Sequence, residues 1–180
     1  MFTDANEPLP IVDENDIEVG TAQRKEVHRR AWRHRAVHIV VVNSRDQVLL
    51  QRRSLVKDTY PGYWDVSVGG HVGVGEAYED AARRELKEEL GVDGALAYRG
   101  KIAASAATNW EFVEVYTCRH EGPFQIHPDE ITEVVWMDLD DVLNRAALER
   151  SWPITRSAIH TFRFWSNLQD SQRSCQPGIF

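Results

Sequence analysis

The sequence predicts an α/β (α+β) fold, a mixed β-sheet with helices on both faces, and three observations support this. Short apolar or alternating segments typical of strands outnumber the helical segments. One strongly periodic helical segment, residues 77–90, stands between strand segments, and the chain returns to strand after it. The 180 residues, 42% of them hydrophobic, suffice for one well-buried domain, and two domains would be cramped.

The first part of the chain supplies a hairpin, a helix and two paired strands. Residues 9–23 predict two short strands around an Asp/Asn turn, and residues 24–35 predict a basic helix. The aliphatic run at 36–43 predicts a buried strand, and residues 48–53 predict its hairpin partner. The Pro-Gly pair at 61–62 then breaks regular structure and predicts a loop before the next strand.

Residues 77–90 carry the clearest helical pattern. Ala82, Leu86 and Leu90 recur every four residues and mark the face that packs on the sheet. Gly91 follows where a left-handed C-terminal cap belongs. The rest of the chain predicts strands at 110–118 and 133–138 and helices at 139–148 and 154–168.

We expect one folded domain with an N-terminal extension. Residues 1–34 supply strands and the basic helix, which pack on the domain. Residues 35–170 form the main domain, and residues 171–180 form a frayed tail. No internal repeat and no break in composition marks a second domain.

The overall charge excludes several classes of partner. A net charge of −7 argues against broad binding to nucleic acids or anionic membranes, which need a positive surface. The longest aliphatic run, Ile39 to Val42, is too short for a membrane span, and the acidic N-terminal residues lack the apolar core of a signal peptide. Cys118 and Cys175 are too few for a disulfide framework or a zinc cluster. We therefore expect a cytoplasmic protein.

The acidic face of the 77–90 helix points to a metal site. At 100° per residue, Glu85, Glu88 and Glu89 fall within about 100° of arc. Like charges at this spacing repel by roughly 0.2–0.5 kcal/mol per pair. A divalent cation would turn this repulsion into binding, because Mg²⁺ prefers hard oxygen ligands. Arg84 is placed to hold one of the carboxylates by a two-pronged hydrogen bond.

The segment from Gly70 to Val92 resembles the signature of the Nudix hydrolase family. It fits the pattern G-x5-E-x7-R-E-U-x-E-E-x-G-U, with U a bulky aliphatic residue, at every defined position. The resemblance implies a Nudix-type α/β/α sandwich with a mixed β-sheet over residues 35–170. It also implies a Mg²⁺-dependent hydrolase, with Mn²⁺ as a substitute, that cleaves a diphosphate linkage in a nucleoside diphosphate-X substrate. A small-molecule diphosphate is then the expected partner.

The resemblance also assigns roles within this box. Glu85, Glu88 and Glu89, with the carbonyl of Gly69 in the loop before them, are the expected metal ligands. The three glutamates and Arg84 are the expected catalytic residues, and Glu76 has a structural role in the loop. How many metal ions bind is left open.

A second resemblance is to type 1 isopentenyl-diphosphate isomerase. Arg53 and Lys57 match the pair that binds its diphosphate, while His34 and His71 match two of its metal ligands. The isomerase has a catalytic cysteine where this chain has Gly69, so its proton donor is missing here. We keep an isomerase-like enzyme as the alternative function, and a binding protein without catalysis as a third.

Several assignments stay open at the level of sequence. We expect Arg53, Lys57 and His71 to bind substrate, while His34 and His71 either hold a second metal or are ordinary hydrogen-bonding residues. The X group and the choice between monomer and homodimer are undetermined. The extra base or metal ligand outside the box is one of Glu111, Glu130 and Glu133.

Overall fold

The computed structural model describes residues 6–148 and 152–174, and it begins with a small N-terminal unit. Strand β1 (Pro8–Val12) pairs antiparallel with β2 (Glu18–Gln23), which confirms the predicted hairpin. Helix α1 (Arg24–Arg30) follows. We expected this helix to reach residue 35, which is wrong. Ala31 adopts a left-handed conformation and ends the helix, and His34 already pairs with the central sheet.

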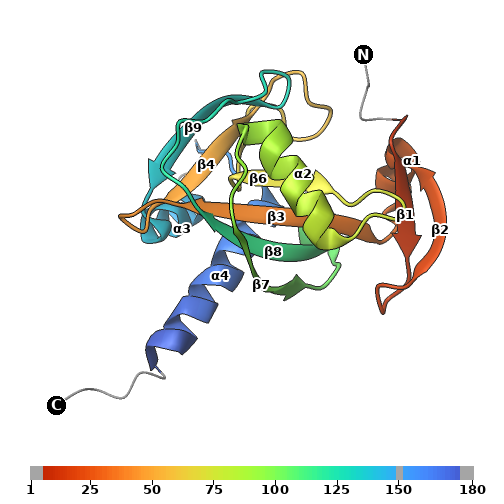
Figure 1. Ribbon diagram of the computed structural model, residues 1–180. Helices are drawn as coiled ribbons and strands as arrows, with labels where there is room; N and C mark the ends of the chain where they lie inside the picture. Colours follow the sequence, from red (N-terminus) through yellow and green to blue (C-terminus); the bar gives the residue numbers. More distant parts are fainter. Residues whose placement is uncertain (1–5, 149–151, 175–180) are drawn as a thin grey trace.

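The central element is a seven-stranded mixed sheet (Figure 1). Its middle strand β3 (His34–Val42) runs parallel to β8 (Glu111–Arg119) and antiparallel to β6 (Val68–His71). The predicted mixed sheet is therefore confirmed. The other strands are β4 (Val48–Arg53), β5 (Trp64–Asp65), β7 (Leu96–Ile102) and β9 (Ile131–Met137).

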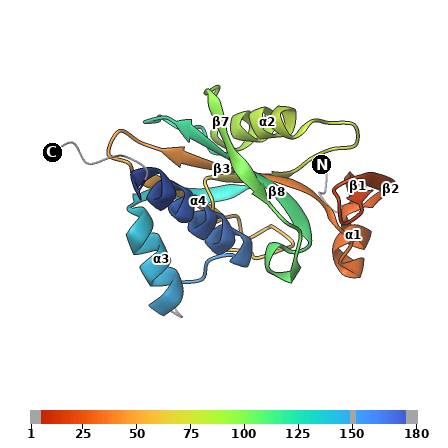
Figure 2. The same ribbon diagram turned by 90° about the horizontal axis from the view of Figure 1, so that it is seen from below.

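Helices cover both faces of this sheet, as predicted. Figures 1 and 2 show α2 (Tyr78–Leu90) on one face and α3 (Leu139–Leu148) with α4 (Arg156–Ser174) on the other. The predicted packing face of α2 is confirmed, because Ala82, Leu86 and Leu90 are all buried in the core on that side. Phe162 and Trp165 of α4 are buried on the opposite side. Gly91 adopts the left-handed cap conformation, with φ 68°.

Two expectations about the later part of the chain need correction. The sequence pattern did not predict β7, whose side chains are mostly half-exposed and whose register shifts between Tyr98 and Gly100. Helix α4 starts two residues later than expected and continues to Ser174, so the expected boundary at residue 170 lies inside the helix. Residues 175–180 of the expected tail lie outside the described residues. No helix among the described residues is both long and apolar enough to cross a membrane.

Asp16, in the turn between β1 and β2, ties the N-terminal unit to the rest of the protein. Its carboxylate accepts hydrogen bonds from Arg35 on β3 (2.7 Å), Tyr78 on α2 (2.9 Å) and Lys101 on β7 (2.6 Å). Burial alone would raise the pKa of Asp16, but these three donors lower it below its ordinary value. The carboxylate therefore links the turn between β1 and β2 to the three elements β3, α2 and β7. Its contribution to the stability of the fold depends on its negative charge.

Candidate active site

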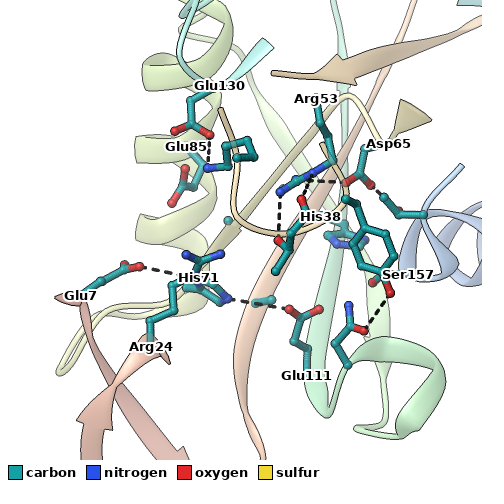
Figure 3. A pocket seen from close by; sticks show the side chains of 18 of the residues that line it. Glu7, Arg24, His38, Arg53, Asp65, His71, Glu85, Glu111, Glu130 and Ser157 are labelled. Carbon is teal, nitrogen blue, oxygen red and sulfur yellow. Dashed lines mark hydrogen bonds and ion pairs between the residues drawn. The ribbon is translucent and has the colours of Figure 1, made fainter. Parts of the chain in front are cut away.

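A cavity of about 1260 Å³ opens between α2, the N-terminal unit, the 54–63 loop and the start of β8. Figure 3 shows Glu85 on the side of α2, Arg53 and Asp65 across from it, and His71 and Glu111 below. Sequence reasoning had singled out these lining residues: Arg53, Lys57, Gly69, Gly70, His71, Arg84, Glu85, Glu88, Glu89, Glu111 and Glu130. Glu133, another candidate base, is half-exposed outside the cavity, where it pairs with Arg52.

The three box glutamates differ strongly in their surroundings. Glu89 is only 4% exposed, and its Oε2 accepts a hydrogen bond from Gln51 on β4 (3.0 Å). Glu85 is nearly buried, whereas the side chain of Glu88 is 60% exposed. Burial raises the pKa of Glu85 to about 7, and burial together with the charge of Glu85 raises the pKa of Glu89 well above its ordinary value.

Two neighbouring carboxylates in a partly desolvated site fit a divalent cation. Burial is the main reason that the pKa values of Glu85 and Glu89 are raised, and the charge of Glu88 adds to the rise at Glu85, as the charge of Glu85 does at Glu89. A hard cation accepts carboxylate oxygens as ligands and removes the repulsion between them. The donor set of this chain therefore suits Mg²⁺ or Mn²⁺ at the predicted position.

Arg84 connects the glycine-rich loop to the acidic face. Its guanidinium donates to both oxygens of Glu76 (2.9 Å each), to Glu85 Oε1 and to the carbonyl oxygen of His71 (3.1 Å). Glu76 Oε2 also accepts from the backbone N–H of Gly73 (2.8 Å). The predicted loop role of Glu76 is confirmed by these contacts, and Arg84 positions Glu85.

Gly69 and Gly70, at the start of the box, allow the side chains of His38 and Glu85 to approach the backbone closely. A Cβ on Gly70 would lie 2.1 Å from Cδ of Glu85, so only glycine leaves room for this carboxylate in its present position. A Cβ on Gly69 would lie 3.3 Å from the ring of His38, a tight contact. Both glycines belong to β6, which pairs with β3.

Besides Arg84, the described lining of the cavity includes three Arg or Lys side chains, each next to a carboxylate. Arg53 donates to Asp65 (3.3 Å), and Lys57 donates to Glu130 (2.6 Å). Arg24 of α1, which the sequence did not single out, forms a two-pronged pair with Asp58 of the 54–63 loop (2.9 and 3.0 Å). Together they offer local positive charge in a protein that is acidic overall.

A second group of metal-ligand type, the histidine cluster, lies beside the box. It consists of His28, His34, His71 and Glu111, and each offers one ligand atom within 4.8 Å of all the others. His34 contacts the carbonyl oxygen of Trp32 through Nδ1 (2.9 Å), so its buried Nε2 faces Glu111 at 3.7 Å without a hydrogen bond.

The charges within the histidine cluster are unequal. Burial and the nearby rings of His71 and His34 lower the pKa of His28 to about 4. Burial alone would also lower the pKa of His71, but the carboxylates of Glu111 and Glu7 raise it to about 9. Three imidazoles and one carboxylate are a donor set that suits transition metals such as Zn²⁺ or Mn²⁺ better than Mg²⁺.

Sequence reasoning missed several residues of this cavity. His28 and Arg24 reach it only because α1 docks beside the central sheet, and no local pattern predicts that docking. Gln51 and Asp65 looked like ordinary strand residues, although both are buried polar groups that contact Glu89 and Arg53. The polar residues within otherwise apolar strands were the available signal.

Comparisons with known proteins identify the family of this chain. The model of the NUDIX domain matches residues 32–161. An uncharacterized Nudix hydrolase of Yersinia pestis is 34% identical over 163 residues, covering 90% of this chain and 88% of the relative. One of Pseudomonas aeruginosa is 34% identical over 155 residues, covering 86% and 90%.

Solved structures show the same fold. The DR0079 protein of Deinococcus radiodurans superimposes with a TM-score of 0.78 at 31% identity, covering 87% of this chain and 98% of that one. The NUDIX domain of Shewanella oneidensis NrtR, solved with ADP ribose, has a TM-score of 0.58 at 20% identity, covering 81% and 98%. The family model and the two relatives show that the chain belongs to the Nudix hydrolase family.

Proposed function

We propose that the protein hydrolyses a diphosphate linkage in a small nucleoside diphosphate-X substrate, with Mg²⁺ or Mn²⁺ at the Nudix box. The observation that carries this proposal is the arrangement of charge in one cavity. Carboxylates of Glu85 and Glu89 line the side formed by α2, and the cations Arg53 and Lys57 enter from β4 and the loop after it. This arrangement suits an anionic diphosphate that is bridged to the carboxylates by metal.

Each residue has a defined role in this proposal. Glu85, Glu88 and Glu89, with the carbonyl of Gly69, hold the divalent metal. When bound, the metal neutralises charge on the diphosphate and lowers the pKa of a water. Arg84 keeps Glu85 in position, and Arg53 and Lys57 bind the diphosphate.

Glu130 is our choice for the proton acceptor outside the box. It lines the cavity, and its charge contributes to the raised pKa of Glu89, so the two carboxylates are near neighbours. Its hydrogen bond to Lys57 links it to the group that binds the diphosphate. Glu111 instead belongs to the histidine cluster.

The histidine cluster, by this proposal, holds a second metal of the transition series. The buried Nε2 of His34, which has no hydrogen-bond partner in the described part of the chain, supports it, because a buried polar atom without a partner costs about 1–3 kcal/mol. Metal analysis of the purified protein tests this directly. We expect Zn²⁺ or Mn²⁺ in the wild-type protein and its loss in His34→Ala, without loss of metal in the exposed control Arg29→Ala.

The isomerase alternative has no proton donor of the expected kind. Cys118, the only cysteine among the described residues, is buried in the core on the side of α2 and does not line the cavity. Gly69 occupies the position of the cysteine in the isomerase motif, and its neighbour there is His38. The relatives above also carry the name of hydrolases.

A hydrolysis screen that detects phosphomonoesters as well as free phosphate tests the proposed function. Nucleoside diphosphates and triphosphates, nucleotide sugars, dinucleotides and isoprenoid diphosphates are incubated with Mg²⁺ or Mn²⁺, and the products are identified. We expect metal-dependent cleavage that Glu85→Gln and Glu89→Gln reduce by at least 100-fold. Substrate binding without turnover by the wild-type protein would instead indicate a binding protein.

A further inference from the structure

The cavity continues past the box into a region that we call the distal compartment, lined by Tyr60, Asn109, Trp110 and Ser157. Figure 3 shows Ser157 on the side of the cavity away from Glu85. Tyr60 comes from the 54–63 loop, and Asn109 and Trp110 come from the turn before β8. The short helix η2 (Ala106–Thr108) of that turn packs against α4, which carries Ser157.

The backbone of the distal compartment is held in a conformation that these residues rarely adopt. Tyr60, Asn109 and Trp110 have φ values of 50°, 52° and 65°, all in the left-handed region. For a residue as bulky as tryptophan this is an outlier, and such residues cluster at functional sites.

Local hydrogen bonds hold this conformation in the turn before β8. Ser105 and Thr108 form a capping box, and the N–H of Trp110 donates to the carbonyl oxygen of Ser105 (2.7 Å). The carbonyl oxygen of Trp110 accepts from the N–H of His34 on β3 (3.2 Å). The turn is therefore built to present Asn109 and Trp110 at the cavity.

The two aromatic rings are fixed by contacts outside the core. The ring of Tyr60 lies 5.4 Å from that of Tyr63, and its hydroxyl donates a long hydrogen bond to Oδ1 of Asn109 (3.5 Å). The ring of Trp110 carries the guanidinium of Arg33 at 5.9 Å from its centroid. Neither residue belongs to the three hydrophobic core clusters, and both line the cavity.

The same compartment offers hydrogen-bonding groups without partners. The hydroxyl of Ser157 is buried, in a residue that is 6% exposed, and it makes no hydrogen bond within the described residues. Over the same residues, the amide nitrogen of Asn109 and the indole N–H of Trp110 make no hydrogen bond, although these two residues are only half-buried. An apolar chain bound here would leave these groups desolvated and unpaired. A planar ring with polar edges would satisfy them and stack on the aromatic rings.

We propose that the distal compartment binds the nucleobase of a nucleoside diphosphate substrate. This deepens the proposed function and rests on it, because the diphosphate is placed at the box. Stacking of a base on an aromatic side chain and hydrogen bonds to its edge select a nucleotide over an isoprenoid diphosphate.

Trp110→Gly is the decisive variant, because glycine accepts the left-handed conformation while the ring is lost. Asp46→Gly, at another left-handed position (φ 58°) in the turn between β3 and β4, is its matched control outside the cavity. ADP and inorganic tripolyphosphate serve as probes with and without a base. Ser157→Ala tests the hydroxyl independently.

We expect Trp110→Gly to raise the KM for ADP by about 5- to 150-fold, the range that corresponds to loss of one base stack. Its kcat for ADP, and both constants for tripolyphosphate, should stay within twofold of the wild type. The melting temperature should not fall, because the strained tryptophan is removed. Ser157→Ala should raise the KM for ADP but not for tripolyphosphate.

An equal rise in KM for both probes, or an unchanged KM for ADP in both variants, would overturn the proposal. Failure of the proposed function gives a different result, in which no diphosphate is hydrolysed with Mg²⁺. In that case the affinity of each variant for ADP, measured by calorimetry, tests the proposed base site. Weaker binding by Trp110→Gly but not by Asp46→Gly supports the base site, and equal affinity refutes it.

Discussion

Gly70→Ala is the substitution whose effect follows most directly from the geometry. The added Cβ would lie 2.1 Å from Cδ and 2.2 Å from Oε1 of Glu85. An ordinary contact starts at 3.4 Å, so the carboxyl group must move by about 1.3 Å or the strand must shift. The carboxylate is the end of a flexible side chain, and Gly70 does not have a left-handed φ. We therefore expect the side chain to move rather than the fold.

The expected consequence is a folded protein with a misplaced catalytic group. A displacement of about 1 Å at a catalytic site can cost about 100-fold in rate, and we expect a fall of that order in kcat/KM. The free energy of unfolding should change by less than about 1 kcal/mol. The assay combines metal-dependent phosphate release with thermal unfolding.

Gly20→Ala serves as the control, because the nearest atom to its added Cβ is 4.0 Å away, in Ile11 on the neighbouring strand. It should keep full activity. Full activity of Gly70→Ala would refute the claim that catalysis depends on the position of the Glu85 carboxylate. If activity is lost only because the variant unfolds, the claim that the Glu85 side chain moves while the fold is kept is refuted.

Three further predictions follow from other parts of the structure. Arg53→Ala and Lys57→Ala should raise KM more than they lower kcat, since both bind the diphosphate before the transition state; equal losses in kcat with unchanged KM would contradict this. The lowered pKa of Asp16 means that its ionised form stabilises the fold above about pH 4, and that this stability is lost as the pH falls through the folded-state pKa. Asp16→Asn should therefore lower the free energy of unfolding at pH 7 by about 1–3 kcal/mol and weaken its dependence on acid, as chemical denaturation across pH would show; a parallel acid profile would count against it. Incubation with isopentenyl diphosphate should yield no dimethylallyl diphosphate above background, as measured by mass spectrometry. Conversion that depends on Glu111 would instead support the isomerase as the function.

The elements whose signals are local could be predicted from the sequence. The span of β4, the packing face of α2 and the whole of α3 agree with their patterns because side-chain periodicity within one segment decides them. The end of α1 and the strand β7 could not be predicted in this way. At His34, pairing with β8 overrides the helical pattern, and in β7 the alternation is blurred by half-exposure and by the shift at Gly100.

The residues of the site likewise fall into a group that the sequence predicts and a group that it does not. The box could be predicted as a unit because its residues lie on one helix and the loop before it, where spacing determines proximity. The histidine cluster joins α1, β3, β6 and β8, and only the folded chain brings His28 to His71, with 3.3 Å between their Nε2 atoms. Glu133 is an alternative that the sequence left open and that does not line the cavity, since it pairs with Arg52 outside it.

Hydrolysis in water enriched in oxygen-18 tests the central claim most directly. The products of diphosphate cleavage are followed by phosphorus NMR. The phosphorus resonance of a phosphate group shifts measurably when the group carries oxygen-18. The account predicts that one phosphate product gains a single oxygen-18 atom, only with Mg²⁺ or Mn²⁺, and at a rate that Glu85→Gln reduces by at least 100-fold. Turnover of a diphosphate without incorporation of the label, or incorporation at the wild-type rate in Glu85→Gln or in excess chelator, would contradict it.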